Sequence, residues 1–193
     1  MNLVFGHGIY EKGRYKGSVC GKHTKEKHLW TGILQRCYSK EYHNLKPTYE
    51  SCTASENFKN FQFFAEWCNQ QVGFGLTDWQ LDKDLLISGN KLYSEDTCVF
   101  LPSHINMLLI KQSLPKIGDT PQGVFFRKDS GKYRAICQTS TCKTRLGDYL
   151  SADAAFEVYK DFKEVAIKAI AAQYKDSLDP RAYLALINYE VTK

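Results

Sequence analysis

Two acidic side chains in the middle of the chain are the clearest candidates for metal chemistry. Asp82 and Asp84 are two residues apart, so in an extended segment they lie on one face, with Lys83 pointing away from them. Two carboxylates on one face can hold a hard cation such as Mg²⁺, which activates water for attack on a phosphodiester. Lys83 would stabilise phosphate charge. His104 and Asn106, further along the chain, complete the candidate catalytic set.

A second group of potential ligands lies near the start of the chain. Four soft or borderline zinc ligands occur there: Cys20, His23, His28 and Cys37. Their irregular spacing makes zinc the minor alternative to surface histidines and buried thiols. The seven cysteines are an odd number, and no export signal precedes them, so we expect reduced thiols, with Cys52 and Cys68 in the core.

Positive charge is unevenly distributed, although the net charge is only +5. Residues 1–47 hold nine Lys or Arg against three Glu, residues 121–147 hold six against one Asp, and the remainder is net acidic. Two basic segments predict two contacts with a phosphate backbone. The candidate DNA-binding residues of the second segment are Arg127, Lys128, Lys132, Arg134, Lys143 and Arg145.

The first half of the chain predicts two helices followed by a ββα unit. Apolar residues recur at helical spacing over residues 26–38 and again over residues 55–71, where Ser55 is a good N-cap. The aromatic stripe of the second helix is typical of a buried core. Residues 79–86 and 94–102 then form short extended segments, and Ser103 caps a helix over residues 103–112.

The last third predicts a three-stranded sheet with a long helix. Pro and Gly mark residues 113–121 as a linker, which divides the chain into domains 1–118 and 119–193. Three strands follow, with Asp129, Ser130 and Gly131 in the first hairpin turn. Ser151 caps a long amphipathic helix, and residues 181–190 form a last helical segment. The expected buried face of the long helix is Ala155, Val158, Tyr159, Phe162 and Ala166.

The C-terminal segment resembles the DNA-binding domain of the apetala-two and ethylene-response-factor family. The residues that carry the resemblance are Gly123-Val124, Gly131 to Ala135, Leu146 to Tyr149, Ser151, Ala154 to Phe156 and Tyr159. It covers residues 121–163 and implies a three-stranded antiparallel sheet on one helix, with the sheet face in the major groove. A two- or three-stranded ribbon fits that groove, and Arg or Lys on it reaches guanine edges or phosphates. Strand alternation should turn one of each adjacent pair toward the helix, so some cations are spectators.

The middle of the chain looks like the HNH-related proteins of phages, which often carry an apetala-two-type domain. The residues concerned are Trp30, Arg36 to Tyr38, Phe58 to Trp67, Leu81 to Asp84, Tyr93, Cys98 to Phe100 and Asn106. In that family a ββα element holds one divalent metal, and a histidine activates water. Here Asp82-Lys83 stands where Asp-His is expected, and the middle asparagine falls at Thr97 or Cys98. The resemblance therefore implies the surroundings of a nuclease site without its base.

The sequence thus predicts an α+β protein that binds double-stranded DNA. One hypothesis is a homing-type endonuclease that cuts with Mg²⁺ or another divalent ion, using Asp82, Asp84 and Asn106. Another is an inactive DNA-binding regulator or counter-defence inhibitor that blocks a host protein, and a third is a purely structural role for residues 81–84. Since the start has no apolar signal and no stretch reaches membrane-spanning length, we expect no membrane and a place in the cytoplasm of an infected host cell.

Overall fold

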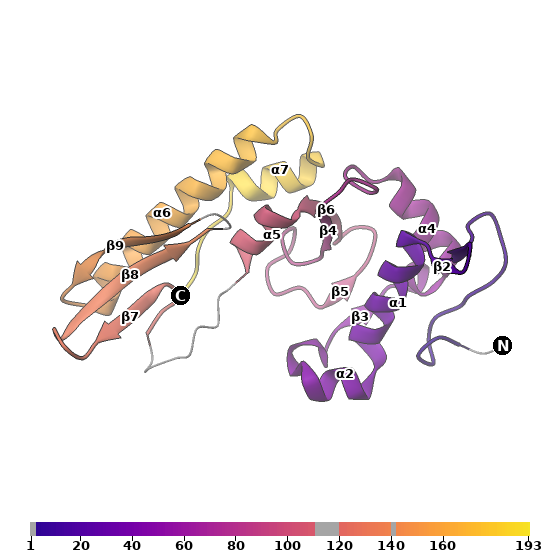
Figure 1. The fold of residues 1–193 in the computed structure, drawn as a ribbon, viewed down its shortest axis with the longest axis horizontal. Helices are drawn as coiled ribbons and strands as arrows, with labels where there is room; N and C mark the ends of the chain where they lie inside the picture. Colours follow the sequence, from indigo (N-terminus) through magenta and orange to yellow (C-terminus); the bar gives the residue numbers. More distant parts are fainter. Residues whose placement is uncertain (1–2, 111–119, 140–141) are drawn as a thin grey trace. The chain divides into compact units, whose positions relative to one another are not determined.

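The chain is an α+β protein built as two compact units (Figure 1). The computed structural model describes residues 3–110, 120–139 and 142–193, and the units divide between Leu101 and Pro102. The boundary expected at 118/119, like most of the linker over 113–121, lies in or beside residues outside this description. The observed division lies nearer the start of the chain than the expected one, because α5 (Ser103–Leu109) contacts α6 (Ala152–Gln173) and so belongs to the second unit. No helix among the described residues is long and apolar enough to cross a membrane.

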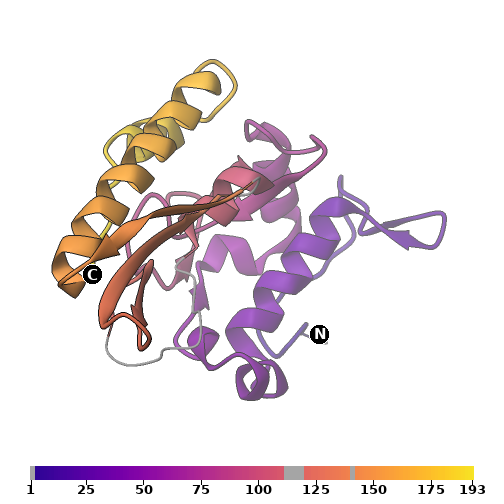
Figure 2. The same ribbon diagram turned by 60° about the vertical axis from the view of Figure 1, so that its left-hand side comes forward.

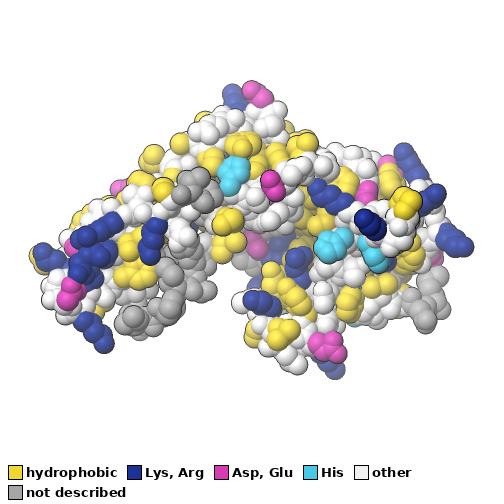
Figure 3. Space-filling model, in the orientation of Figure 1, with side chains coloured by type: hydrophobic (Ala, Val, Ile, Leu, Met, Phe, Trp, Pro, Cys, Tyr) yellow, Lys and Arg dark blue, Asp and Glu magenta, His cyan; other side chains and the backbone are white. Residues whose placement is uncertain are grey.

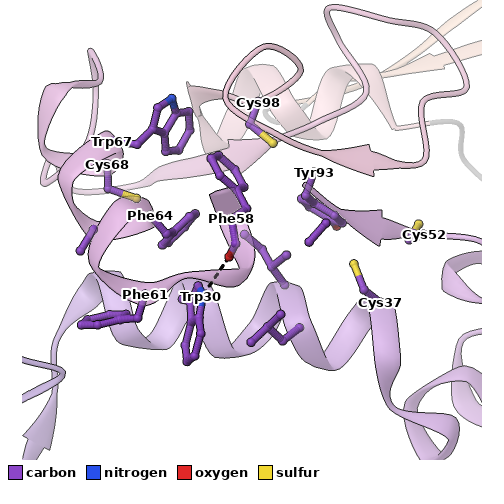
Figure 4. Packing of buried hydrophobic residues seen from close by; sticks show 14 of the residues in the cluster. Trp30, Cys37, Cys52, Phe58, Phe61, Phe64, Trp67, Cys68, Tyr93 and Cys98 are labelled. Carbon is purple, nitrogen blue, oxygen red and sulfur yellow. Dashed lines mark hydrogen bonds between the residues drawn. The ribbon is translucent and has the colours of Figure 1, made fainter. Parts of the chain in front are cut away.

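Aromatic packing between α1 (Lys25–Tyr38) and α4 (Phe61–Gln70) forms the core of the first unit (Figure 4). Thr24 caps α1, since its side chain accepts a hydrogen bond from the backbone N–H of Lys27. The indole N–H of Trp30 donates to the carbonyl of Phe58 over 2.9 Å, which satisfies the polar edge of a fully buried ring. The expected aromatic core is confirmed, with Cys52 and Cys68 buried in it.

The helix expected over residues 55–71 is broken in two. It forms α3 (Glu56–Lys59), then Asn60 in an extended conformation, then α4, whose first N–H groups bond to the Asn60 side chain. Ile9 from the N-terminal segment occupies the break, because its N–H donates to Lys59 and its carbonyl accepts from Phe61. The prediction of one helix was wrong because this interruption comes from a residue far away in the sequence.

The N-terminal segment is docked on the helices and ends in an exposed hairpin. Gln62 holds it through hydrogen bonds to the backbone N–H and carbonyl of Tyr15, at 3.0 and 2.9 Å. The Lys27 ammonium lies over the rings of Tyr10 and Trp30, 3.8 and 4.2 Å from their centroids, and burial lowers its pKa. Figure 2 shows the hairpin of β1 (Ser18–Val19) and β2 (Lys22–His23) extending from the start of α1.

Short elements complete the first unit. The helix α2 (Lys40–Leu45) and the 3-10 helix η1 (Pro47–Tyr49) lead to β3 (Thr53–Ala54), which pairs in parallel with β5 (Leu92–Tyr93). The strands β4 (Trp79–Asp82) and β6 (Val99–Pro102) pair, and α5 follows β6 directly. The chain order of two strands and a helix agrees with the expected ββα unit. Ser103 is the first helical residue, however, and the cap position is Pro102, which has no side-chain cap.

The second unit is a three-stranded antiparallel sheet packed on α6 (Figures 1 and 2). Its strands are β7 (Val124–Arg127), β8 (Lys132–Gln138) and β9 (Lys143–Tyr149), as the sequence predicted. Phe156 and Tyr159 of α6 pack against Val124 and Ala135 in the buried layer between helix and sheet. Ser151 caps α6 as expected, because its hydroxyl accepts from the N–H of Ala154.

The buried face of α6 differs from the expected one. Ala155 and Tyr159 are buried, but Phe162 is 36% exposed and Val158 and Ala166 are only partly covered. The helix instead buries Ala155, Phe156, Tyr159, Lys163, Ile167 and Ala171. The helix α7 (Pro180–Ile187) contacts α6 and lies beside its C-terminal part (Figure 1); it is shorter than the segment expected over 181–190.

We predict that Gly123→Ala destabilises the second unit by about 2–4 kcal/mol. Gly123 has a φ of +77°, and a Cβ there would lie 2.2 Å from a ring carbon of Tyr159. Gly131 is the matched control, because its φ is +65° but a Cβ would meet nothing within 4 Å. Gly131→Ala should therefore cost about 1 kcal/mol. Urea unfolding measures both, and equal losses would contradict the close packing of Gly123 on Tyr159.

Candidate nucleic-acid interface

The register of the sheet places the basic strand residues on the face away from α6. Arg134 lies opposite Asp148 across β8 and β9, while its neighbours Tyr133 and Ala135 pack toward the helix. Arg127 lies opposite Lys132 across β7 and β8, and paired residues share a face. The strands β7, β8 and β9 carry five Lys or Arg on this outer face against one Asp.

Asp148 organises three arginines from the three strands. Arg134 holds it side-on, with Nε 2.7 Å from Oδ1 and Nη2 3.0 Å from Oδ2. Arg127 Nη1 lies 3.4 Å from Oδ2, and Arg145 also donates to that oxygen. Hydrogen bonding from Arg134, with the charges of Arg134 and Arg145, holds the pKa of Asp148 well below its ordinary value. The carboxylate therefore stays ionised and fixes the guanidinium groups relative to one another.

A β-bulge brings Arg145 to the face that holds Asp148. The two residues are three apart, and strict alternation would place them on opposite faces of the sheet. Ala135 pairs with Gly147, but the next residue, Ile136, pairs with Arg145, so β9 has one extra residue at this point. The extra residue restores Arg145 and Asp148 to one face, as bulges do when they redirect side chains.

Figure 3 shows Lys and Arg side chains gathered over the sheet. Lys132 and Lys143 are exposed strand residues, and Lys128 is exposed in the β7–β8 turn. Arg127 is also held by Asp129, whose Oδ1 accepts from Nε over 3.0 Å. The expectation that some strand cations turn toward the helix was wrong, because the alternate positions that face α6 are apolar: Val124, Tyr133, Ala135 and Cys137.

Asp148 is the residue of this candidate interface that could not be identified from the sequence. It stood in the resemblance only as part of a Leu-Gly-Asp-Tyr string, without a role. The sequence signal that could have identified it is that Asp148 is the only acidic residue in strands β8 and β9, whose other charged residues are basic, and that it follows Gly147. Its position opposite Arg134 depends on the bulge, which the sequence pattern does not show.

The acidic pair of the first unit is engaged within its own loop. Asp82 ends β4, and its Oδ1 accepts hydrogen bonds from the backbone N–H groups of Asp84 and Leu85, at 2.9 and 2.7 Å. Burial raises the pKa of Asp82, and those two hydrogen bonds oppose the rise. Asp84 lies beyond the strand, where its carboxylate pairs with the Lys83 ammonium.

Lys83 is buried, which corrects the expectation that it points away from both acids. Its side chain is 7% exposed, and its ammonium donates to the Asn90 carbonyl over 2.7 Å as well as to Asp84. The Asn90 side chain in turn donates to the carbonyls of Lys83 and Leu92, both at 2.7 Å. These contacts close residues 82–92 into a hydrogen-bonded loop.

The remaining members of the catalytic set belong to the other unit. His104 and Asn106 lie on α5, and the ring of His104 is 5.3 Å from that of Tyr174. The structure thus brings Asp82, Lys83 and Asp84 together in one loop, and it places the other two residues in the second unit. Among the described residues, no group of three or more His, Cys, Asp or Glu is arranged to hold a metal ion.

The four candidate zinc ligands occupy different environments in the first unit. Cys20 is exposed in the hairpin turn, and His23 is exposed on β2. His28 is exposed on α1. Cys37 is buried in the aromatic core, where burial raises the pKa of its thiol to about 12. Cys37 is therefore a protonated core thiol at neutral pH, which agrees with the buried thiols expected as the alternative to a zinc site.

No protein-family model matches the chain, and neither a curated protein nor a solved structure matches it. Its function is therefore inferred from the geometry of its own residues.

We predict a pH-dependent stability loss in Asp148→Asn. A carboxyl pKa depressed by folding stabilises the folded state above the ordinary value, about 4, and this contribution disappears as the pH falls toward the lower, folded pKa. Wild type should exceed the variant in unfolding free energy by a constant amount from pH 7 to about 5, and the difference should shrink below that.

Urea unfolding at several pH values between about 7 and 3 measures this difference. Asp176→Asn removes an exposed carboxylate outside the sheet and controls for net charge. A difference that stays unchanged down to the lowest pH would show that the carboxylate is not held by the arginines.

Proposed function

We propose that this protein binds double-stranded DNA through the outer face of β7, β8 and β9. The observation that carries the proposal is the set of three arginines, one from each strand, ordered around Asp148. A narrow sheet of this kind fits the major groove, where Arg bonds to guanine edges or phosphates. The resemblance to the apetala-two family implies the same mode of binding.

Ordering the arginines before binding favours affinity and specificity together. A free arginine side chain loses rotamer freedom when it binds, at a cost of about 0.5–1.5 kcal/mol. Arg134 loses less, because Asp148 already holds its Nε and Nη2. The contact with Asp148 uses the Nε and Nη2 groups of Arg134 and does not use Nη1. Lys132 and Lys143, which are exposed on the same face, would supply contacts to phosphates.

A metal-dependent endonuclease is the second candidate function. The order β4, β6 and α5, with Asp82 at the end of β4, favours it, because this is the expected ββα order. Mg²⁺ or a similar ion would bind Asp82 and Asp84. The hydrogen bonds to Asp82 and the pairing of Asp84 with Lys83 favour the alternative, a non-catalytic phage regulator or inhibitor of a host protein. Either would act in the cytoplasm of the infected cell.

We predict that DNA affinity falls steeply with salt and that Lys143→Gln and Arg145→Gln each flatten this dependence. Binding releases counterions, and each phosphate contact that is removed lowers the slope of log K against log salt by about one. Gel shifts with a duplex of about 30 base pairs, at salt concentrations between about 50 and 200 mM, measure the slope.

Lys175→Gln is the matched control for these variants. It removes the same charge from an exposed residue beyond the end of α6. It should leave the slope within the error of wild type. Affinity that does not change with salt, or an equal effect of all three substitutions, would contradict binding at the sheet.

Cleavage is tested separately with supercoiled plasmid and Mg²⁺ or Mn²⁺. If the second candidate is correct, wild type nicks the plasmid and Asp82→Asn does not. The amide keeps an oxygen that can accept from Asp84 and Leu85 while it removes the charge that binds the metal. Circular dichroism confirms that the variant is folded. Wild type that leaves the plasmid intact with both metals rejects the nuclease and leaves the DNA-binding proposal standing.

A further inference from the structure

The helix α6 carries an apolar stripe on its solvent-exposed side. Phe162 and Val165 are 36% and 67% exposed. The stripe consists of Val158, Phe162, Val165, Ala169 and Ala172. Spacings of four and three residues are those of a helix that packs lengthwise against another helix. Among these five side chains only Val158 is partly covered.

The charged residues on one edge of the stripe are complementary to those of a second α6 helix that runs antiparallel to the first. Asp161 lies on this edge toward the start of α6, and Lys168 lies two turns later on the same edge. Both are exposed. When two such helices run antiparallel and meet near Val165, Asp161 of each faces Lys168 of the other. In a parallel pair related by a two-fold axis, this edge of the two helices lies on opposite sides of the contact, so Asp161 and Lys168 do not meet.

We propose that two copies of this chain associate through this stripe, with their α6 helices antiparallel. The contact is self-complementary and closed by a two-fold axis, as in most homodimers. It buries Phe162 and Val165 and forms the Asp161–Lys168 pair twice. Because one helix face is a small interface, we expect a dissociation constant on the order of 10 µM.

The stripe lies opposite the face of α6 that holds the sheet. Successive helical residues are about 100° apart, so Val165 and Ile167 point in nearly opposite directions. Ile167 is fully buried, and Tyr159 on the same side packs against the sheet. A dimer formed through the stripe therefore leaves the outer face of both sheets exposed. If the proposed DNA binding is correct, the dimer would recognise two half-sites related by a two-fold axis.

Sedimentation velocity without DNA tests the dimer, at protein concentrations between about 1 and 500 µM. Wild type should shift from monomer to dimer across this range. Val165→Glu should weaken association at least about tenfold, because it places a charge at the two-fold axis. Leu184→Glu is the matched control, since Leu184 is 56% exposed on α7 and outside the stripe. Wild type that stays monomeric throughout overturns the proposal.

A charge exchange tests the antiparallel orientation. Asp161→Lys alone should weaken the dimer about five- to tenfold, because it brings two lysines together at both ends of the contact. The double variant Asp161→Lys with Lys168→Asp should restore it. Failure of the double variant to recover would reject this geometry. These measurements contain no DNA, so their outcome is independent of the gel-shift result.

Discussion

The Arg134–Asp148 pair across β8 and β9 is the interaction on which the character of the second unit depends. A lone carboxylate among five cationic strand residues limits their mutual repulsion and holds each arginine in a defined direction. Without it, Arg134 and Arg145 would be flexible cations at the same face, and Arg127 would be held by Asp129 alone. With it, they form an ordered array whose members come from three different strands.

That pair depends in turn on the backbone. The bulge after Ala135 gives β9 the extra residue that puts Arg145 and Asp148 on one face. On the other face, Gly123 leaves room for the Tyr159 ring, which anchors α6 against β7 and β8. The glycines of the motif and the charged residues therefore have separate tasks. The glycines set the distance of the helix and the shape of the sheet, and the charged residues use the surface that results.

Elements that depend on local sequence were predictable, and those that depend on distant contacts were not. The strands β7, β8 and β9, the Ser151 cap and the aromatic core follow from alternation, capping and helical spacing. The break at Asn60 requires Ile9, and the burial of Lys83 requires the carbonyl of Asn90. The candidate site shows the same division, since its cations were identified from charge and spacing. The role of Asp148 could not be identified in the same way, because a bulge changes which residues share a face.

The two faces of α6 explain why its stripe could not be assigned to core or surface from periodicity. The helix has 22 residues, about 33 Å, whereas strands of seven residues extend about 23 Å. The sheet thus covers only part of the helix, and α7 lies beside the C-terminal part of the helix (Figure 1). The residues that α6 buries, Ile167 among them, lie on one side of the helix, so apolar residues on the opposite side remain in water. Their exposure is unfavourable for an isolated unit, and a second helix of the same sequence would remove it without using the face that the proposed DNA contact requires.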